Sequence, residues 1–179
     1  RLKSVGMLKP MESLRTADPI KWHYGHFFDP KKIDKNYLSF TKILTDLDVE
    51  ILWMNHQNNE IADSIFTYDA SFMTKEGAIL LSPGKSLRKG EEKIHENFYK
   101  KNNIPVIGKI SGTAIAEGGD MFWVDEKTLV IGNGFRTNQN GIEQIKSILN
   151  AFEIKVFSFD LPFFRGPDAC LHMMSLVSI

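Results

Sequence analysis

Apolar residues recur at two different spacings along the chain, and their alternation predicts three helices that are each followed by a short strand. The first helix would begin at Pro30, with Asp29 as its N-cap, because the apolar residues that follow are spaced by three or four. Its buried stripe would be Ile33, Tyr37, Phe40, Leu44 and Leu47. Two further helices are predicted at about 91–101 and 140–152, and the three strands at 49–54, 104–110 and 154–159. The inward side chains of the second and third helices would be Ile94, Phe98, Ile142, Ile145, Leu149 and Phe152.

The segments before the second and third helices, 69–81 and 120–131, share an apolar, turn, apolar pattern that is typical of a hairpin. The repeated unit is therefore strand, strand, helix, strand, with a period of about 50 to 55 residues. This α/β period favours units placed around an axis, with helices outside and strand ends inside. A doubly wound sheet would lack the hairpin, and an all-β propeller would lack the helices. Complete units would begin near residues 5, 61 and 115, and a fourth would open near Ala169.

The chain has 179 residues, the usual size of one domain, and its 22 basic residues balance 22 acidic ones. A balanced charge provides no electrostatic footprint for nucleic acid or an anionic membrane, so neither is expected as a partner. No apolar run reaches the ~20 residues that a membrane helix needs, and the first residues lack a signal-peptide pattern. The single cysteine, Cys170, excludes an internal disulfide, and a cytoplasmic location is expected.

Both ends of the sequence resemble those of a truncated chain. It begins with Arg1, and it closes on Leu176-Val177-Ser178-Ile179, an apolar run that reads as a strand with no turn after it. We therefore expect one catalytic domain over residues 1–179, truncated at its C-terminus and holding about three and a half units. An open ring would leave an unpaired strand edge, which favours association into a homo-oligomer.

Three polar residues occupy matching positions of the repeat. Asp63, Glu117 and His172 each end the predicted first strand of a unit, about 55 positions apart. Around an axis such positions converge, so two carboxylates and an imidazole would face one central cavity. Buried carboxylates need a compensating charge, and a planar guanidinium offers N–H donors to two of them at once. Acids beside a histidine raise its pKa, which suits a proton donor near neutral pH.

Each of these three residues also has a purely structural explanation. Asp63 at the start of a strand is compatible with a turn or a helix cap, and His172 between apolar neighbours is compatible with a core histidine. Glu117 is the strongest functional candidate, because two glycines at 118–119 beside an acid imply a special backbone path.

Two arginines lie in corresponding loops before the second and third helices. Arg88 lies in loop 82–91, and Arg136 lies in the glycine-rich loop 132–138. Either could clamp a carboxylate bidentately, and either could be a solvated loop arginine. The second loop lacks the spacing of a P-loop or of a dinucleotide fingerprint, and no Cys/His spacing indicates zinc. Neither a cofactor nor a metal is therefore expected.

The motifs resemble those of the guanidino-group-modifying enzymes, the pentein superfamily, which includes dimethylarginine dimethylaminohydrolases, arginine deiminases and amidinotransferases. The matching strings are Asp63-Ser-Ile-Phe66-Thr-Tyr-Asp69, Glu117-Gly-Gly-Asp120, Gly134-Phe-Arg136-Thr-Asn138 and Leu171-His172. The resemblance covers nearly the whole chain and implies the pentein fold, five ββαβ units around a pseudo-fivefold axis. The dimethylarginine hydrolase branch fits somewhat better than the others, since Met174 stands where arginine deiminases have an acid. Tyr68 departs from the acid or arginine that these hydrolases often carry there.

By this resemblance the protein is a citrulline-forming hydrolase of arginine or methylarginine, in which a cysteine thiolate attacks the guanidinium carbon. His172 would be the general acid and base, while Glu117 and Asp69 would hold the guanidinium. The other implied substrate contacts are Asp63 to the α-amino group, Arg88 and Arg136 to the α-carboxylate, and Phe66 to the stem.

The family places its catalytic cysteine far downstream of the histidine, so the nucleophile is expected beyond residue 179. Cys170 would share one side of a strand with His172, but a cysteine on an apolar strand usually serves packing. Two enzymatic alternatives stay open, an arginine deiminase and an amidinotransferase that passes the same intermediate to an amine. A non-enzymatic alternative is a ribosome-binding pentein, which would not be expected to combine Glu117, Arg136 and His172.

Overall fold

The computed structural model describes residues 2–56, 60–162, 166 and 172–177. The backbone forms two compact units, Arg1–Thr67 and Tyr68–Ile179, and each is described by itself. None of the helices in the described part of the chain is both long and apolar enough to span a membrane. Several residues that carry predictions lie outside the described ones, namely Ala169, Cys170, Leu171 and the run Ser178-Ile179.

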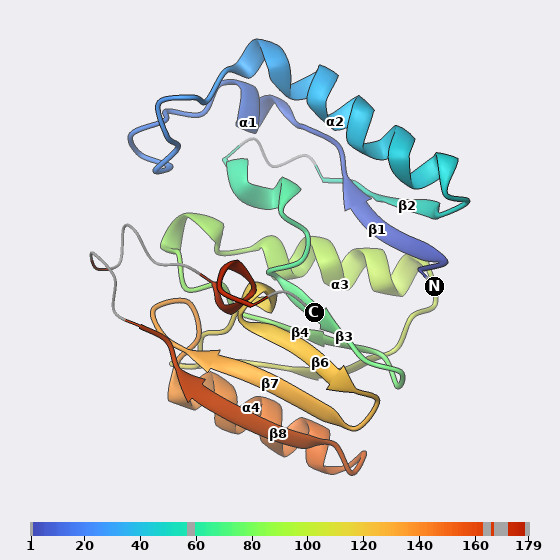
Figure 1. The fold of residues 1–179 in the computed structure, drawn as a ribbon, viewed down its shortest axis with the longest axis vertical. Helices are drawn as coiled ribbons and strands as arrows, with labels where there is room; N and C mark the ends of the chain where they lie inside the picture. The colour runs from blue at the N-terminus through green and yellow to red at the C-terminus, as the bar shows by residue number, and fades with distance from the viewer. Residues whose placement is uncertain (1, 57–59, 163–165, 167–171, 178–179) are drawn as a thin grey trace. The chain divides into compact units, whose positions relative to one another are not determined.

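The unit Tyr68–Ile179 contains the predicted ββαβ motif twice (Figure 1). The first copy consists of β3 (Ser71–Met73), β4 (Ala78–Leu80), α3 (Glu91–Lys101) and β5 (Val106–Lys109). The second consists of β6 (Met121–Asp125), β7 (Thr128–Asn133), α4 (Gln139–Asn150) and β8 (Lys155–Asp160). In each copy the middle strand pairs antiparallel with the strand before it and parallel with the strand after the helix. The two predicted hairpins and the helix-to-strand order are therefore confirmed.

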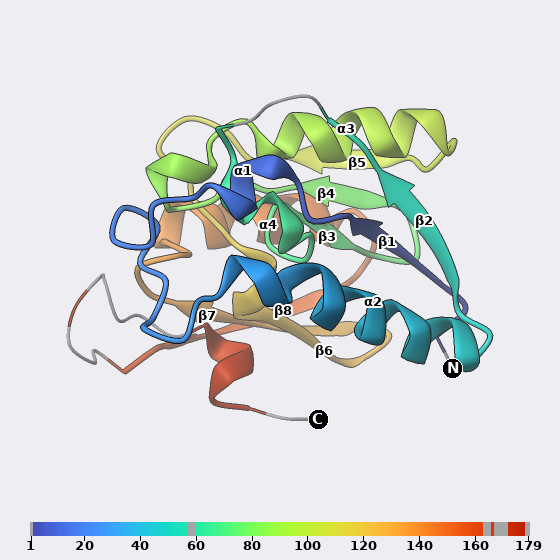
Figure 2. The same cartoon turned by 90° about the horizontal axis from the view of Figure 1, so that it is seen from above.

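One apolar core joins the two sheets of this unit. The helix faces predicted to be inward are buried for Ile94, Phe98, Ile142, Ile145 and Leu149, while Phe152 lies beyond the end of α4 and is half-buried. The three buried α4 residues share one core with strand and loop residues, namely Phe72, Ile79, Leu81, Ile110, Ala114, Ala116, Met121, Leu129 and Ile131. Each fully buried aliphatic side chain contributes about 1.5–3 kcal/mol, so this core fixes the strand ends that carry the site. Seen from above, α3 runs alongside β4 and β5 (Figure 2).

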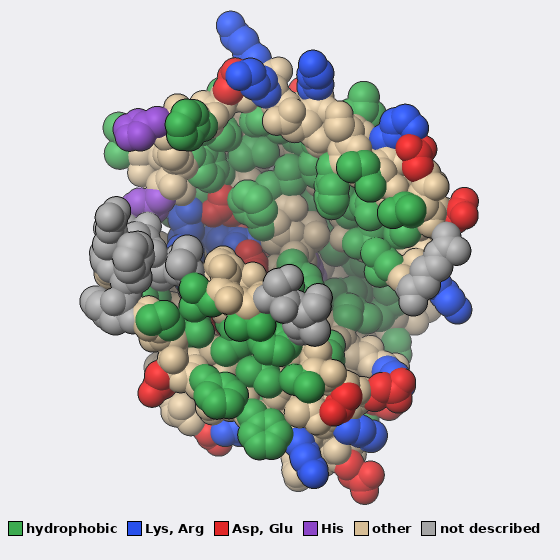
Figure 3. Space-filling view, viewed as in Figure 1, with side chains coloured by type: hydrophobic (Ala, Val, Ile, Leu, Met, Phe, Trp, Pro, Cys, Tyr) green, Lys and Arg blue, Asp and Glu red, His purple; other side chains and the backbone are tan. Residues whose placement is uncertain are grey.

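The sheet β6–β8 packs one face on α4 and leaves apolar side chains on the other. Alternation along the strands sends Leu129 and Ile131 into the core, whereas Val124, Phe157 and Phe159 are exposed. Hydrophobic side chains gather over this region of the sheet in the lower half of the space-filling view (Figure 3).

The unit Arg1–Thr67 is built on two parallel strands, β1 (Ser4–Leu8) and β2 (Glu50–Met54), with α1 (Glu12–Arg15) and α2 (Pro30–Asp46) between them in the chain. Asp29 caps α2 by accepting a hydrogen bond from the backbone N–H of Lys31 at 3.0 Å, as predicted. The predicted stripe is only partly covered. Its members Ile33, Tyr37 and Leu44 are half-buried, whereas Phe40 and Leu47 are exposed.

The expected first unit is shorter than predicted. Residues 2–56 form one parallel strand pair and no hairpin, so this segment is a β–α–β element rather than a complete ββαβ unit. The described residues thus hold two complete ββαβ units, and the predicted count of three and a half remains a prediction. Leu176 and Val177, predicted to open a strand, follow the 3₁₀ helix Met173–Ser175 and belong to no strand.

The three in-phase polar residues were predicted on strands, and this was wrong. Asp63 lies in the 3₁₀ helix Ala62–Ile65, Glu117 precedes the 3₁₀ helix Gly118–Asp120, and His172 precedes Met173–Ser175. Next to Glu117, the described residues form a single isolated β-bridge, between Ser82 and Ala116.

Asn138, from the predicted Arg-Thr-Asn motif, fastens α4 to the loop before Glu117. Its side-chain oxygen accepts hydrogen bonds from the backbone N–H groups of Gly141 (2.9 Å) and Ile115 (3.1 Å), and its amide donates to the Thr113 carbonyl at 2.9 Å. We expect Asn138→Ala to lower the free energy of unfolding by about 1–2 kcal/mol, since it removes an N-cap and strands a backbone donor. Urea unfolding measures this loss. Asn138→Asp keeps the acceptor oxygen and should recover most of it, and equal losses in both variants would contradict the capping role.

Candidate active site

Glu117 and His172 form an acid–imidazole pair in which the acid is buried and the imidazole is half-buried. Nε2 of His172 lies 2.7 Å from Oε2 of Glu117, and Glu117 has no exposed surface. The second oxygen, Oε1, accepts a hydrogen bond from the backbone N–H of Gly84 at 2.9 Å. Glu117 directly precedes the 3₁₀ helix Gly118–Asp120, and His172 directly precedes the 3₁₀ helix Met173–Ser175. Two short turns, with their acid and imidazole 55 residues apart in the chain, thus bring the two groups together.

Asp69 is the third member of this cluster. It ends the loop before β3, and its Oδ1 lies 4.0 Å from Nε2 of His172. The same oxygen accepts from the backbone N–H of Gly119 at 3.1 Å, while Oδ2 accepts from Nη1 of Arg88 at 2.7 Å. The structure therefore brings together Asp69, Glu117 and His172, three of the residues that the motifs singled out.

The pKa values of Glu117 and His172 move apart. Burial opposes ionisation of Glu117, but the hydrogen bond from His172 and the charge of Arg88 outweigh it, so the pKa of Glu117 lies below its ordinary value. Burial also opposes charging of His172, yet the bond to Glu117 and the charge of Asp69 outweigh it, so the pKa of His172 lies above its ordinary value. Both shifts favour the form of the pair in which Glu117 is a carboxylate and His172 an imidazolium.

Asp120 and Thr137 form hydrogen bonds to the backbone at Met173 and Glu117, and no role was predicted for either residue. Oδ2 of Asp120 accepts from the Thr137 hydroxyl at 2.7 Å, and Oδ1 accepts from the backbone N–H of Met173 at 3.0 Å. Thr137 Oγ also accepts from the backbone N–H of Glu117 at 3.2 Å. Burial raises the pKa of Asp120, against the hydrogen bond from Thr137. Both residues belong to the matched Glu-Gly-Gly-Asp and Arg-Thr-Asn strings, which was the available signal.

The glycines of the Glu-Gly-Gly-Asp string are required by close packing. A Cβ on Gly119 would lie 2.7 Å from Cγ and 2.8 Å from Nδ1 of His172, and one on Gly118 would collide with the carbonyl oxygen of Tyr68. Both glycines are therefore needed for close approach, by the Tyr68 carbonyl at Gly118 and by the imidazole ring at Gly119, and not for a left-handed φ.

The two predicted arginines differ in their surroundings. Arg136 keeps about a quarter of its side chain exposed and places Nη1 3.6 Å from Oε1 of Glu117. Arg88 is buried, with Nη1 on Asp69 and the rest of its guanidinium on Glu91, so it faces protein carboxylates rather than an open surface. Arg88 thus pairs with two acids inside the fold, since a buried guanidinium needs fixed partners, and its predicted role as a clamp for a substrate carboxylate stays a prediction. Glu91 was missed by the sequence, where it reads as an ordinary first-turn acid.

Asp63, Phe66 and Tyr68 complete the predicted set. Asp63 is buried within Arg1–Thr67, where Oδ1 accepts from the hydroxyl of Tyr24 at 2.7 Å. Phe66 is exposed and helps to line a cavity of about 420 Å³ within that unit, together with Leu14, His23, Tyr24, Gly25, Phe27, Phe28 and Ile65. Tyr68, in the other unit, donates to the carbonyl of Met121 at 3.4 Å.

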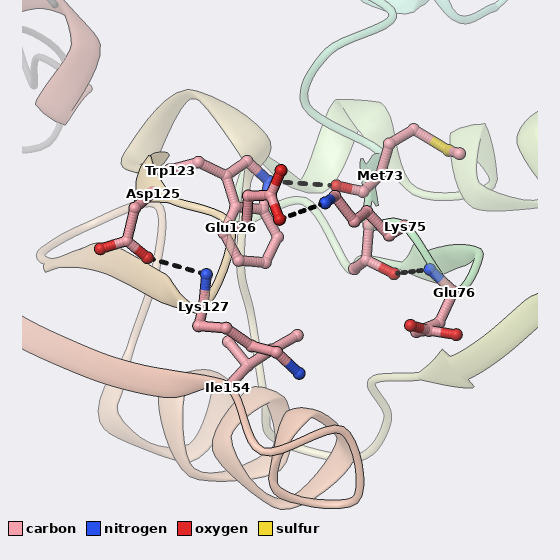
Figure 4. Close-up of a pocket in the computed structure, with 9 residues that line it drawn as sticks. Met73, Lys75, Glu76, Trp123, Asp125, Glu126, Lys127 and Ile154 are labelled. Atoms are coloured by element: carbon pink, nitrogen blue, oxygen red, sulfur yellow. Dashed lines mark hydrogen bonds and ion pairs between the residues drawn. The ribbon is translucent and has the colours of Figure 1, made fainter.

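A second cavity, of about 530 Å³, lies between the hairpin turns of the two ββαβ units, away from the cluster (Figure 4). Its lining residues are Met73, Thr74, Lys75, Glu76, Trp123, Asp125, Glu126, Lys127 and Ile154. The indole N–H of Trp123 donates to the Met73 carbonyl, and Lys75 pairs with Glu126 across the rim. None of the predicted site residues lines this cavity.

The cluster can bind a cation between two carboxylates and can transfer a proton from the imidazole. Donor atoms of Asp69, Glu117 and His172 all lie within 4.8 Å of one another, a spacing that a metal ion could also use. Those atoms already bond to one another and to Arg88 and Gly119, so we assign no metal to them. The part of the chain that the structure describes contains no cysteine, since Cys170 lies outside it.

Comparison with known proteins agrees with the predicted resemblance. The sequence model of the family described as arginine deiminase matches residues 54–159, more than half of the chain. Uncharacterized protein ZK1307.1 of Caenorhabditis elegans is 29% identical over 169 residues, 94% of this chain and 60% of that protein. N(G),N(G)-dimethylarginine dimethylaminohydrolase of Pseudomonas aeruginosa is 28% identical over 121 residues, 68% of this chain and 47% of that protein. The chain thus spans about half to three fifths of the length of these relatives.

Solved structures share the fold. A Cys-to-Ser mutant of the Pseudomonas aeruginosa dimethylarginine dimethylaminohydrolase, complexed with citrulline, superposes with a TM-score of 0.78 at 25% identity, covering 96% of this chain and 64% of that one. The N-terminal domain of ArgZ, an arginine dihydrolase from cyanobacteria, gives 0.72 at 20% identity, covering 89% of this chain and 58% of that one, a likeness of fold alone. The chain therefore belongs to the arginine deiminase family, within the pentein superfamily of guanidino-group-modifying enzymes and close to the dimethylarginine dimethylaminohydrolases.

Proposed function

We propose that this protein hydrolyses the guanidino group of arginine-like substrates and releases citrulline. The observation that carries the proposal is the cluster in which the buried acids Asp69 and Glu117 flank the half-buried imidazole of His172 at 4.0 and 2.7 Å. Two fixed carboxylates at such spacing match the N–H donors of a planar guanidinium, and an imidazolium beside them supplies a proton where an amine departs.

The chemistry would run in two steps. A cysteine thiolate, which we expect from sequence outside residues 1–179, bonds through sulfur to the guanidinium carbon. The C–N bond to the leaving amine breaks, and His172 gives that amine its proton. Neutral His172 then takes one proton from water, whose oxygen bonds to the same carbon while the C–S bond breaks. The second proton of that water passes to the solvent, where it protonates the released amine. The thiolate is regenerated, and the substrate carries a ureido group, as in citrulline.

The remaining roles follow from the family resemblance and are proposals. Asp63 would bind the substrate α-amino group, Arg136 its α-carboxylate, and Phe66 would pack on its stem. Arg136 is favoured for the carboxylate because its side chain keeps some exposure, whereas Arg88 is enclosed by protein acids. A dimethylarginine hydrolase is preferred over an arginine deiminase because Met174 replaces the acid of the deiminases.

The proposal is tested with the complete polypeptide, including any sequence downstream of Ile179. Arginine, monomethylarginine and dimethylarginine are supplied in turn, and citrulline and the released amine are measured. We expect citrulline from at least one of them, with water as acceptor. Formation of a new guanidino compound when glycine is added would instead establish an amidinotransferase, and no turnover with any guanidine would exclude the proposed activity.

The activity should fall on the alkaline side of its pH profile. The folded pKa of His172 is raised above 6.5, so its proton is present below that raised value and is lost as pH rises through it. Glu117→Gln removes the bond to a charged partner that raises the pKa of His172, while burial still lowers it, so the alkaline limb should move to lower pH. Glu143→Gln, on the exposed face of α4, is the matched control and should leave the limb in place. If the alkaline limb stayed at the same pH in Glu117→Gln, the group that titrates there would not be His172.

Gly119→Ala should displace the imidazole. The added methyl group meets the ring of His172 at 2.7 Å, and a shift of about 1 Å in a catalytic group can lower the rate about 100-fold. Gly108→Ala introduces an equally tight contact, 2.6 Å from Ile148, in the same unit but away from the cluster. Turnover and thermal unfolding of both variants are compared. We expect stability losses in both and the large rate loss only in Gly119→Ala, so equal rates in the two would argue against a role for the His172 position.

A further inference from the structure

Arg88 is a guanidinium built into a site that we propose binds a guanidinium. Its Nη1 donates to Oδ2 of Asp69 at 2.7 Å and lies 3.9 Å from Oε2 of Glu117. These are the two carboxylates assigned above to the substrate. A guanidinium of the protein itself at this distance would compete with the substrate for both acids, unless another group keeps it in place.

Glu91 provides that restraint. Its two oxygens accept from Nε of Arg88 at 3.0 and 3.1 Å, and Oε2 also accepts from Nη2 at 2.7 Å. Glu91 is the first residue of α3, and Gly90 before it has the left-handed φ of 100°, which turns the helix start back toward Arg88. Both members of the pair are almost fully buried, so their geometry is set by each other rather than by solvent.

A second contact fixes the same strand to the same helix. The hydroxyl of Ser71, two residues after Asp69, lies 2.7 Å from Nδ1 of His95 and 2.5 Å from the hydroxyl of Tyr99. Burial, helped by the charge of Arg88, lowers the pKa of His95 to about 4, so this imidazole is neutral and serves as a hydrogen-bonding partner. The start of β3 is therefore held to α3 at two points, once through Arg88 and once through Ser71.

We propose that Glu91 is a positioning residue that holds Arg88 on one oxygen of Asp69, and thereby leaves the other oxygen of Asp69 and the carboxylate of Glu117 for the guanidinium of the substrate. The inference rests on the proposed function for the identity of that ligand. In this arrangement Arg88 sets the orientation of Asp69 through Oδ2, and Oδ1 faces Gly119 and His172. Without Glu91, Arg88 would move toward Glu117 and occupy part of the space of the substrate guanidinium.

The test is a double-mutant cycle in the complete polypeptide, with Glu91→Gln, Asp69→Asn and the double variant. If Glu91 acts through Asp69, Glu91→Gln should lower kcat/KM for the best guanidine substrate roughly 10-fold, with most of the loss in KM. The same change should cost almost nothing further in the Asp69→Asn background. If the fold-losses of kcat/KM in the two single variants multiplied in the double variant, the two residues would act independently and the proposal would be overturned. Glu92→Gln, which alters the neighbouring first-turn acid and keeps an acceptor for Gly90, is the matched control and should behave as the unaltered protein.

A readout that needs no turnover separates this inference from the proposed function. With ¹⁵N-labelled histidine, NMR reports the ring nitrogens of His172, whose Nε2 faces both carboxylates. Glu91→Gln should shift these signals and Glu92→Gln should not, whereas unchanged signals in Glu91→Gln would overturn the positioning role. Should Glu91→Gln lose cooperative unfolding, Glu91→Asp keeps the charge but is too short for the bidentate contact, and the same two readouts apply. Absence of turnover with shifted signals would reject the hydrolase and retain the positioning role.

Discussion

The carboxylate of Glu117 lies inside the protein without exposed surface, and much of the surrounding structure follows from the need to stabilise that charge. An isolated buried carboxylate would be protonated, because the charged form loses its hydration. Here the carboxylate accepts a hydrogen bond from the backbone N–H of Gly84, is hydrogen-bonded to the ring of His172, and lies near the charge of Arg136. These partners come from three loops, so keeping one charge in place requires all three loops to be folded.

The same requirement explains the composition of the loops. A side chain on Gly84 would press on the backbone at Phe135 and Arg136, and one on Gly119 would press on His172. The glycines therefore let two loops and an imidazole approach the acid closely enough to bond. A site of this kind is rigid because each polar group already has a partner, which leaves few ways for the chain to rearrange.

Charge is also arranged in layers around the cluster. Asp69 and Glu117 flank the imidazole, Arg88 neutralises Asp69, and Glu91 neutralises Arg88. Alternation of sign lowers the cost of burying several ions in one place, since each has an opposite neighbour at hydrogen-bonding distance. The pKa shifts follow from this order: the acid beside two cations becomes a stronger acid, and the imidazole beside acids becomes a stronger base.

The sequence by itself determined the repeated ββαβ unit, the cap at Asp29, the buried faces of α3 and α4, and the family. These depend on residue spacing within about 15 positions or on short motifs, so they can be read locally. Only the tertiary structure decided that Glu117 and His172 enter turns rather than strands, that Arg88 is enclosed by acids, and that Asp120 and Thr137 brace the site. Those features arise from contacts between residues up to 55 positions apart, such as Glu117 with His172, and no local pattern specifies which loops will meet. Glu91 is the clearest example, because an acid in the first turn of a helix has the same local signature whether it faces water or a buried arginine.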